Sequence, residues 1–428
     1  MPAPRPTLED WLGRIERLHP RTIELGLERV HDVAARMAID LPGVRFVVGG
    51  TNGKGSTCAM LERILRAAGY RVGRYGSPHL LHFNERALVD GRMAGDEELV
   101  ASFERVESAR GATSLTYFEF TTLAVLDLFS RASLEAAVLE IGLGGRLDAV
   151  NIVDADCAIL TSVDLDHTDL LGATREAIGF EKAAIFRPGR PAVCTDPDPP
   201  ASVIAESGRI GATLRRFGRE FRAEAPEGPG PGRSWNYRGV HADRLSLPWP
   251  ALRGPHQIAN AAGALAALEA VADRLPVTQQ AVREGLRAVE LPGRFQVLPG
   301  RPVVVLDVGH NPHAARALAR TLRAHGHFSH TRAVFGMLRD KDARSVAAAL
   351  APVIDHWHLA PTAGERGRDA ATLRKDAFEA PTPCTEHAST AEALQAALSA
   401  SGPDDRILVF GSFLVVAEAL RWLERDTR

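Results

Sequence analysis

The chain has 428 residues, 45% hydrophobic and 24% charged, which is typical of a globular protein with a large buried core. This length predicts two or three domains. Lys and Arg (51) nearly balance Asp and Glu (53), which disfavours general attraction to nucleic acid or to an acidic membrane. The sequence shows no bilayer-spanning apolar run, no signal-peptide core and no closely spaced cysteines. We therefore expect a cytoplasmic enzyme, monomeric in the simplest case, with no nucleic-acid or membrane partner.

Residues 7–38 are predicted to be largely helical, because apolar residues recur there at helical spacing. The stretch from His19 to Arg29 interrupts this pattern. It is either an ordinary connection between helices or a segment whose polar side chains face a ligand.

The most informative stretch follows at residues 44–66. It predicts a buried strand from Val44 to Val48, a glycine loop from Gly49 to Ser56 and a helix from Thr57 to Ala68. Strand, glycine loop and helix in this order direct backbone N–H groups and a helix N-terminus at a phosphate.

Lys54, within that loop, would reach the terminal phosphates of a nucleotide. The loop departs twice from the general P-loop pattern, with Val48 where Gly is usual and Gly55 where Ser or Thr is usual. An exposed lysine in a glycine turn is the alternative. The flanking strand and helix favour a nucleotide site of a particular branch of ATPases.

Polar residues also end three later strands. Because ligands bind at the carboxyl ends of strands in α/β sheets, we expect a lysine, a hydroxyl, a carboxylate and an imidazole to converge there, with Mg²⁺ as the expected metal. The strands and polar residues are Tyr70–Tyr75 before Ser77, Ala136–Ile141 with Glu140, and Cys157–Val163 before Asp164, Asp166 and His167.

Three further polar residues need interpretation, and two of them, Glu119 and Asn260, allow two interpretations each. Glu119, among aromatic residues, is either solvated or a substrate contact. Lys182, in a helical stretch, is interpreted from composition alone as a solvated lysine. Asn260 is either a helix cap or a nucleotide contact.

Residues 224–233 are rich in Pro and Gly, and this composition predicts a loop or hairpin.

The best domain boundary is Leu291–Phe295, where Pro and Gly break a helical pattern. Beyond it, strands alternate with helices again, at residues 303–306, 332–335, 356–359 and 407–410. The predicted fold is α/β: a P-loop ATPase domain with a mostly parallel sheet (residues 1–292), followed by a smaller Rossmann-like domain (residues 297–428).

Seven motifs, in order, resemble those of the folylpolyglutamate synthase/dihydrofolate synthase family, and they cover nearly the whole chain. They are Gly49–Ser56, Ser77–Leu80, Leu139–Asp148, Asp166–Asp169, Glu181–Ala183, Leu291–Phe295 and Asp307–His313. Gly55 also fits this family, whereas the related Mur ligases usually have Thr or Ser there. One departure is Leu414, where bacterial members often have His after Gly-Ser-Phe.

The resemblance implies an ATP-dependent ligase that adds L-glutamate to dihydropteroate, forming dihydrofolate, and to reduced folates. ATP would convert the acceptor carboxylate into an acyl phosphate that the glutamate amine attacks. The implied small-molecule partners are ATP, Mg²⁺, dihydropteroate, folates and L-glutamate.

The resemblance also implies roles for individual residues. Lys182 matches a lysine that is carbamylated in this family, and Lys54, Lys182, His167 and Glu140 form the expected catalytic group. The expected nucleotide contacts are Asn52, Gly53, Lys54, Gly55, Ser56, Asn260, Arg294 and Asp307, and the expected metal ligands are Ser77, Glu140 and His167. The expected substrate contacts are Thr22, Ile23, Glu24, Leu25, Thr116, Tyr117, Phe118, Glu119, Leu147, Asp148, Ala149 and His310.

Three alternatives stay open. The chain could carry only one of the two folate activities, or it could bind ATP as a regulatory module without turnover. A Mur-type ligase acting on a UDP-linked peptide is disfavoured, because the 43 residues before Val44 are fewer than a domain needs.

Overall fold

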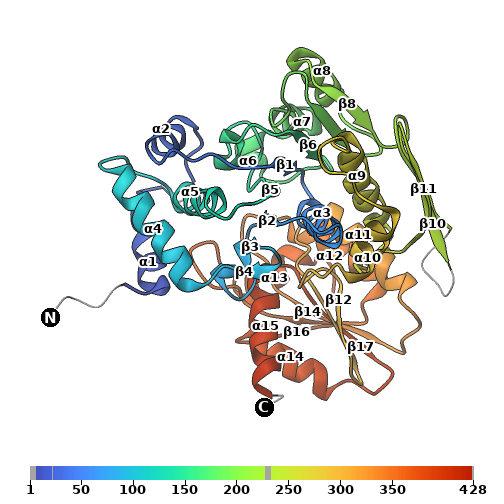
Figure 1. Ribbon diagram of the computed structural model, residues 1–428. Coiled ribbons are helices and arrows are strands. Elements are labelled where there is room, and N and C mark those ends of the chain that lie inside the picture. Colours follow the sequence, from blue (N-terminus) through green and yellow to red (C-terminus); the bar gives the residue numbers. More distant parts are fainter. Residues whose placement is uncertain (1–5, 22, 227–232, 427–428) are drawn as a thin grey trace. The chain divides into compact units, whose positions relative to one another are not determined.

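A computed structural model describes residues 6–21, 23–226 and 233–426 (Figure 1). The chain divides into two compact units, Met1–Pro250 with Ile258–Val289, and Ala251–Gln257 with Glu290–Arg428. Both units combine helices with parallel-rich sheets, so the predicted α/β class is confirmed. In the described ranges, no helix has the length and apolar character needed to cross a membrane.

Eight strands form the main sheet of the first unit, in the order β4-β3-β2-β5-β1-β6-β7-β8. From β2 to β8 the neighbours pair in parallel, whereas β3 and β4 add an antiparallel edge. The strands are β1 (Val44–Gly49), β2 (Val72–Tyr75), β3 (Ala87–Val89), β4 (Arg92–Met93), β5 (Ala136–Glu140), β6 (Cys157–Leu160), β7 (Pro191–Cys194) and β8 (Thr213–Arg216).

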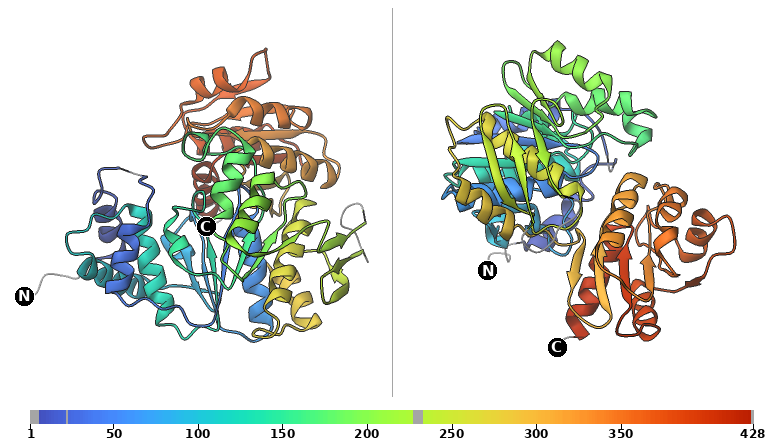
Figure 2. Two further views of the ribbon diagram at one scale, coloured as in Figure 1. Left: turned by 90° about the horizontal axis from the view of Figure 1, so that it is seen from above. Right: turned by 90° about the vertical axis from the view of Figure 1, so that its right-hand side faces the viewer.

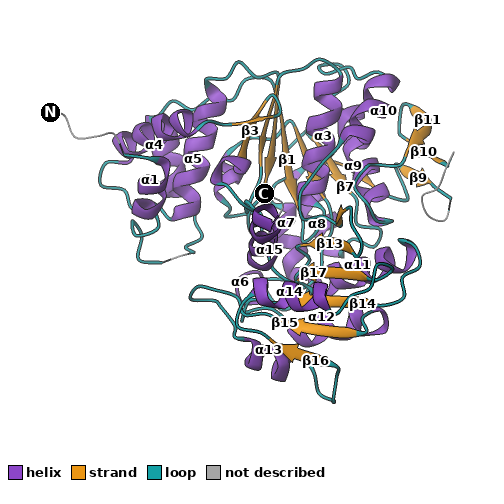
Figure 3. Ribbon diagram, turned by 90° about the horizontal axis from the view of Figure 1, so that it is seen from below, coloured by secondary structure: helices purple, strands orange, loops and turns teal. Residues whose placement is uncertain are grey.

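Helices cover both faces of this sheet, α4 and α5 on one side and α3, α9 and α10 on the other (Figure 3). The helices are α1 (Leu8–Ile15), α2 (Glu28–Arg36), α3 (Lys54–Ala67), α4 (Asp96–Arg110), α5 (Tyr117–Ser130), α6 (Thr168–Leu171), α7 (Arg175–Ala183), α8 (Ala201–Ile210), α9 (His256–Ala270) and α10 (Gln279–Ala288). Short 3₁₀ turns are η1 (Phe83–Arg86) and η2 (Ala149–Ile152).

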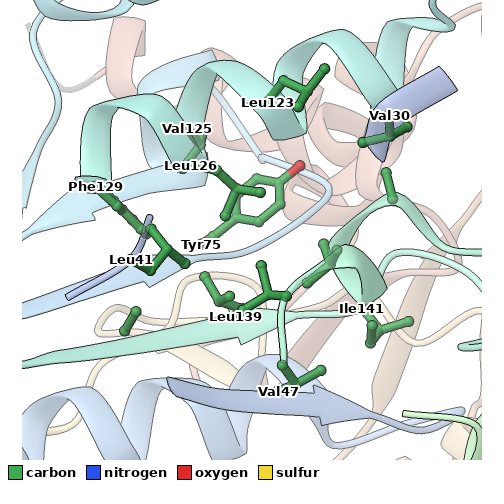
Figure 4. Close-up of a cluster of buried hydrophobic side chains, with 14 of the residues drawn as sticks. Val30, Leu41, Val47, Tyr75, Leu123, Val125, Leu126, Phe129, Leu139 and Ile141 are labelled. Atoms are coloured by element: carbon green, nitrogen blue, oxygen red, sulfur yellow. The ribbon is translucent and has the colours of Figure 1, made fainter. Parts of the chain in front are cut away.

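The core follows from the two-residue period of the strands, because successive side chains point to opposite faces. Val47, Tyr75 and Leu139 come from three neighbouring strands and pack beneath α5, which contributes Leu126 and Phe129 (Figure 4). All five are almost completely buried. The central strands are buried on both faces, which explains their nearly continuous apolar sequences.

A three-stranded antiparallel sheet lies beside α10 (Figure 2). Its strands are β9 (Arg222–Glu224), β10 (Ser234–Arg238) and β11 (Asp243–Pro248). The Pro- and Gly-rich stretch predicted as a loop or hairpin connects β9 to β10, and its residues 227–232 lie outside the described part of the chain.

The second unit has a six-stranded sheet in the order β12-β13-β17-β14-β15-β16, parallel except for β12. Its strands are β12 (Gln296–Leu298), β13 (Val303–Asp307), β14 (Thr331–Phe335), β15 (His356–Leu359), β16 (Cys384–Glu386) and β17 (Arg406–Phe410). Its helices are α11 (Pro312–Ala324), α12 (Ala343–Leu350), η3 (Ala351–Val353), α13 (Ala370–Ala377), α14 (Thr390–Ser399) and α15 (Phe413–Asp426).

Three expectations about local structure need correction. The P-loop helix begins at Lys54, three residues earlier than predicted, because Gly53 adopts the left-handed conformation that starts it. The interruption expected from His19 to Arg29 is confirmed, but its bounds differ, because α1 ends at Ile15, α2 begins at Glu28 and the described residues between them, 16–21 and 23–27, are not helical. Asn260 lies inside α9 and is buried, so it does not cap the helix.

Candidate active site

The loop after β1 needs glycine at two positions. Gly53 has φ +89°, and a Cβ atom there would lie 2.6 Å from Oδ1 of Asn260. Gly50 has φ +144°, and a Cβ atom there would overlap Oγ1 of Thr161. Because other residues rarely adopt such φ values, the close approach of the loop to β6 and α9 depends on glycine.

Hydrogen bonds from the segment after β6 fix the loop. Oγ1 of Thr161 donates to the Asn52 carbonyl at 2.6 Å, and the Asn52 amide donates to Oγ of Ser162 at 3.0 Å. Nζ of Lys54 donates to the Gly50 carbonyl at 3.0 Å. An ammonium group and the first amides of α3 therefore meet in one rigid loop, the usual basis of phosphate binding.

The predicted polar residues come from four adjacent strands of the sheet, in the order β2-β5-β1-β6. The register pairs Val48 with Glu140 across β1 and β5, and it pairs Tyr75, the last residue of β2, with Leu139, so that Gly76 follows at the level of Glu140. A Cβ atom at Gly76 would lie 3.2 Å from Oε2 of Glu140, which places this buried carboxylate beside the backbone that leads into Ser77. The expectation that these strands end side by side is confirmed.

The donors at this edge suit a divalent metal that is shared with phosphates. They are the hydroxyl of Ser77, the carboxylate of Glu140 and the imidazole of His167, which follows β6. Within residues 6–21, 23–226 and 233–426, no three His, Cys, Asp or Glu side chains form a complete metal cage. Mg²⁺ usually takes one or two carboxylates plus substrate phosphates, so an incomplete donor set fits; the imidazole is a less usual Mg²⁺ ligand.

Lys182, on α7, is buried, so the interpretation as a solvated lysine is wrong. Burial, together with the positive charge of Lys54, lowers its pKa to about 7, whereas Asp166 and Asp148 act in the opposite direction. A lysine in this setting is neutral much of the time near pH 7. It can therefore act as a nucleophile that an ordinary lysine cannot provide.

A pocket of about 250 Å³ lies in the first unit next to this edge. Three separate segments with predicted substrate contacts meet there, although the sequence places them up to 126 positions apart (149 − 23). Its lining is Ile23, Glu24, Leu25, Ser77, Pro78, Arg86, Thr116, Tyr117, Phe118, Glu119, Gly142, Leu143, Leu147, Asp148 and Ala149. Ser77 also follows β2, so the pocket adjoins the strand ends. Thr22 lies outside the described residues.

The pocket combines aromatic walls with a buried acid. The ring of Phe118 stacks on Tyr75 with centroids 6.4 Å apart. Asp148 accepts hydrogen bonds from the amides of Leu143 (2.7 Å) and Val150 (3.0 Å). Burial raises the pKa of Asp148 to about 6, although these amides favour the ionised form. A cavity with aromatic walls and a fixed acid at Asp148 suits a flat heteroaromatic ligand that has N–H donors.

Five lining residues were not among the predicted substrate contacts, and Arg86 is the most informative. Its guanidinium lies over the rings of Phe83 and Tyr117, and its Nε donates to Nδ1 of His79 at 2.9 Å. Nothing in the sequence around Arg86, which follows the Ser77-Pro-His segment, predicts that this arginine lines a pocket. The other four are Ser77, Pro78, Gly142 and Leu143.

In the second unit, the predicted residues gather around the carboxyl end of β13, with Arg294 just before β12, Asp307 as the last residue of β13 and His310 after it. Asp307 accepts hydrogen bonds from the amides of Phe295 (2.9 Å) and Gly309 (2.8 Å). Burial raises its pKa, while Arg294 opposes that shift. The guanidinium carbon of Arg294 lies 5.2 Å from the centroid of the Phe413 ring, and the centroids of the His310 and Phe413 rings are 6.4 Å apart. Arg294, Asp307 and His310 thus share one edge of their own sheet.

A larger hollow, about 470 Å³, lies at the opposite, amino end of that sheet. Arg406 lines it and donates to the Leu322 carbonyl at 2.8 Å, in the last turn of α11. The negative end of the helix dipole therefore offsets this buried charge. None of the residues predicted for the site lines the hollow.

Comparison with known proteins agrees with this geometry. Residues 48–268 match the Mur ligase middle domain, and residues 293–413 match the Mur ligase glutamate ligase domain. The dihydrofolate synthase/folylpolyglutamate synthase of Escherichia coli K12 is 44% identical over 97% of this chain and 96% of its own length.

Solved structures are similar over the whole chain. E. coli FolC in complex with DHPP and ADP has a TM-score of 0.94, with 44% identity and 100% of each chain covered. A bifunctional folylpolyglutamate synthase/dihydrofolate synthase with Mn, AMPPNP and L-glutamate bound has a TM-score of 0.89, with 43% identity and 98% of each chain covered. With its two Mur ligase domains and this likeness along its full length, the chain belongs to the dihydrofolate synthase/folylpolyglutamate synthase family of ATP-dependent amino-acid ligases.

Proposed function

We infer that this chain joins L-glutamate to dihydropteroate, forming dihydrofolate, and to reduced folates, with ATP converted to ADP and phosphate. The observation that carries this inference is the aromatic pocket directly beside the P-loop edge, with Ser77 common to both. That arrangement lets a bound carboxylate reach the terminal phosphate of a bound nucleotide.

The chemistry explains why the two sites must adjoin. A carboxylate resists an incoming amine, because its charge repels the nucleophile and oxide is a very poor leaving group. Transfer of the γ-phosphoryl group to a carboxylate oxygen breaks the phosphoanhydride bond between the β- and γ-phosphates of ATP and forms an acyl phosphate, with ADP as the leaving group. The glutamate amine then attacks the carbonyl carbon, loses its proton and expels phosphate, which leaves an amide.

Lys54 and the amides at the start of α3 would stabilise the charge on the transferring phosphoryl group. Ser77, Glu140 and His167 would hold Mg²⁺, which supplies further charge neutralisation when bound. Asn52, Gly53, Gly55, Ser56 and Asn260 complete the proposed phosphate and nucleotide contacts in the first unit, and Arg294 and Asp307 are proposed contacts in the second.

Lys182 is the proposed site of carbamylation. Carbon dioxide reacts with a neutral amine, and the buried setting of Lys182 supplies one because its pKa is about 7. The product carries a negative charge close to Lys54, where it can assist metal binding. The solvated alternative is excluded by the burial of the side chain.

In the pocket, Asp148 would accept from the pterin ring while Tyr117 and Phe118 flank it, and residues 23–25, 116–119 and 147–149 would enclose it. His310 is the proposed contact on the glutamate side. We assign the ATP-binding domain to residues 1–292 and the glutamate ligase domain to residues 297–428, supported by the end of the first unit at Val289 and by the two domain matches.

The test is an assay of ADP release with each substrate omitted in turn. We expect release only when ATP, Mg²⁺, L-glutamate and either dihydropteroate or tetrahydrofolate are all present. Mass spectrometry should find each acceptor extended by a glutamyl residue, and ¹⁸O from the acceptor carboxylate should appear in phosphate. ATP binding without acceptor-dependent release of ADP would contradict the proposal.

A further inference from the structure

Three acids line the pocket, Glu24, Glu119 and Asp148, and one arginine holds the first two. Nη1 of Arg29 donates to Oε1 of Glu24 at 2.6 Å, and Nη2 donates to Oε1 of Glu119 at 2.8 Å. Nη2 also donates to the main-chain carbonyl of Glu24 at 3.1 Å. Glu24 and Glu119 belong to different walls of the pocket. Arg29, on α2, is not among the lining residues, so its guanidinium joins the two walls from outside the cavity.

The two walls differ in how the rest of the structure supports them. Glu119 lies in the first turn of α5, and its Oε2 accepts from the Thr116 amide at 2.7 Å in a capping box. Residues 23–26 belong to no helix or strand, and the side chain of Ile23 is 45% exposed. The rigid helix therefore holds the irregular wall in place through Arg29.

The charges around the pocket also depend on this residue. The side chain of Glu119 is 4% exposed, so its carboxylate needs a nearby cation or donor. With Arg29 in place, one positive charge faces two negative ones, and Arg21, 3.5 Å from Glu24, adds a second cation. Without Arg29, two acids would face a substrate whose own reacting group is a carboxylate.

We propose that Arg29 is a positioning residue for the acceptor substrate: it joins the 23–25 wall of the pocket to the 116–119 wall and neutralises the acids on both. This role rests on the proposed function, because it assumes that the pocket binds dihydropteroate. It predicts a defect in acceptor binding, with the phosphate site unaffected.

The test is steady-state kinetics with dihydropteroate and then ATP as the varied substrate. Arg29→Met should raise KM for dihydropteroate by about tenfold or more, while kcat and KM for ATP stay within about twofold of wild type. Arg29→Lys keeps the charge but cannot contact both carboxylates with a planar fork, so its KM should rise less.

A second variant removes the charge of Glu119 on α5 and is measured by the same KM for dihydropteroate. Gln at position 119 can keep the capping box while it removes the unpaired charge. Arg29→Met/Glu119→Gln should therefore recover at least about threefold of the lost affinity. A purely structural role for Arg29 would show no such recovery.

A matched control is the ion pair of Asp127, which lies on α5 about two turns beyond Glu119. Arg105 on α4 pairs with the buried Asp127 on α5 at 2.6 Å, and neither residue lines the pocket. Arg105→Met should leave KM for dihydropteroate unchanged.

An Arg29→Met enzyme with wild-type KM, a parallel rise in KM for ATP, or no recovery in the double variant would overturn the role of Arg29 alone. A wild-type enzyme that releases no ADP with dihydropteroate would overturn the proposed function, and this role with it.

Discussion

Lys54 is the residue on which the phosphate site depends most directly. Its Nζ lies 3.0 Å from the Gly50 carbonyl, inside the loop that precedes α3. Alanine is a good helix former, so Lys54→Ala should keep the helix and remove only the charge. We expect kcat to fall by about 100- to 1000-fold with little change in thermal unfolding.

The control for this variant is Lys375→Ala, a change at an exposed lysine on α13. It should leave turnover unchanged in the same assay. Wild-type turnover by Lys54→Ala would contradict the nucleotide assignment.

Lys182 gives a prediction that depends on pH. Its pKa of about 7 means that the neutral amine becomes more abundant as pH rises through 7, so carbamate formation should increase in that direction. ¹³C NMR with labelled bicarbonate should show a carbamate resonance that Lys182→Ala lacks. A spectrum identical for both proteins well above pH 7 would rule out the modification.

Residues differ in how well the sequence reveals them. Lys54 and Glu140 stand at the ends of apolar runs, so their neighbours in sequence predict their place at the sheet edge. Arg29 and Arg86 have no such signal. The partner of Arg29 on α5 lies 90 positions away, and a single sequence does not show which of many arginines meets which acid.

At the scale of elements, the packing of α10 on α3 limits what position 285 can hold. A Cβ atom at Gly285 would lie 2.6 Å from Cα of Ile64 on α3, a backbone atom that moves only with its helix. Gly285→Ala should therefore lower the free energy of unfolding by about 1–3 kcal/mol. Urea unfolding measures this change.

Gly208, in α8, provides the opposite case, because no atom lies within 4 Å of its Cβ position. Gly208→Ala should raise the free energy of unfolding by up to about 1 kcal/mol, since alanine favours a helix more than glycine. Equal stabilities for the two variants would contradict the described packing of α3 and α10.

The histidines around β15 predict how the stability of the second unit depends on pH. Nδ1 of His358 lies 3.1 Å from Nε2 of His387, and the rings of His356 and His358 are 4.9 Å apart. Burial lowers the pKa of His358 from 6.5 to about 4, with His356 and His387 adding to this shift. Between these values the unfolded chain binds a proton that the folded chain does not, so stability falls as pH decreases from 6.5 to about 4.

Each such proton changes the free energy of unfolding by up to about 1.4 kcal/mol per pH unit. His358→Gln removes a titrating group, and its urea-unfolding midpoint should therefore depend less steeply on pH over this range. The same slope in variant and wild type would show that His358 is not a source of acid sensitivity.

Elements are predictable to the extent that they are buried. The central strands β1, β5 and β6 are continuous apolar runs, and the sequence located each within a few residues. The short strands β12 and β16 are partly exposed and carry no clear period, and neither was predicted. The antiparallel sheet of β9, β10 and β11 was anticipated only as a loop or hairpin around the Pro- and Gly-rich stretch.

For the molecule as a whole, the order of the motifs was more informative than any motif alone. It predicted the α/β class and the ligase family, which the 44% identity to the E. coli enzyme over 97% of the chain supports. It did not predict that residues 251–257 group with the second unit while most of α9 belongs to the first. That division depends on contacts between segments that are distant in sequence, and local patterns do not record them.

The central claim is that neighbouring parallel strands bring Lys54, Ser77, Glu140 and His167 around the phosphates of one nucleoside triphosphate. A crystal with a non-hydrolysable ATP analogue and Mn²⁺, measured for anomalous scattering, tests it most directly. We predict the γ-phosphate at Lys54 and an anomalous peak within bonding distance of the Glu140 carboxylate and the Ser77 hydroxyl. Phosphates bound outside the Gly49–Ser56 loop, or a metal held by other residues, would contradict the claim.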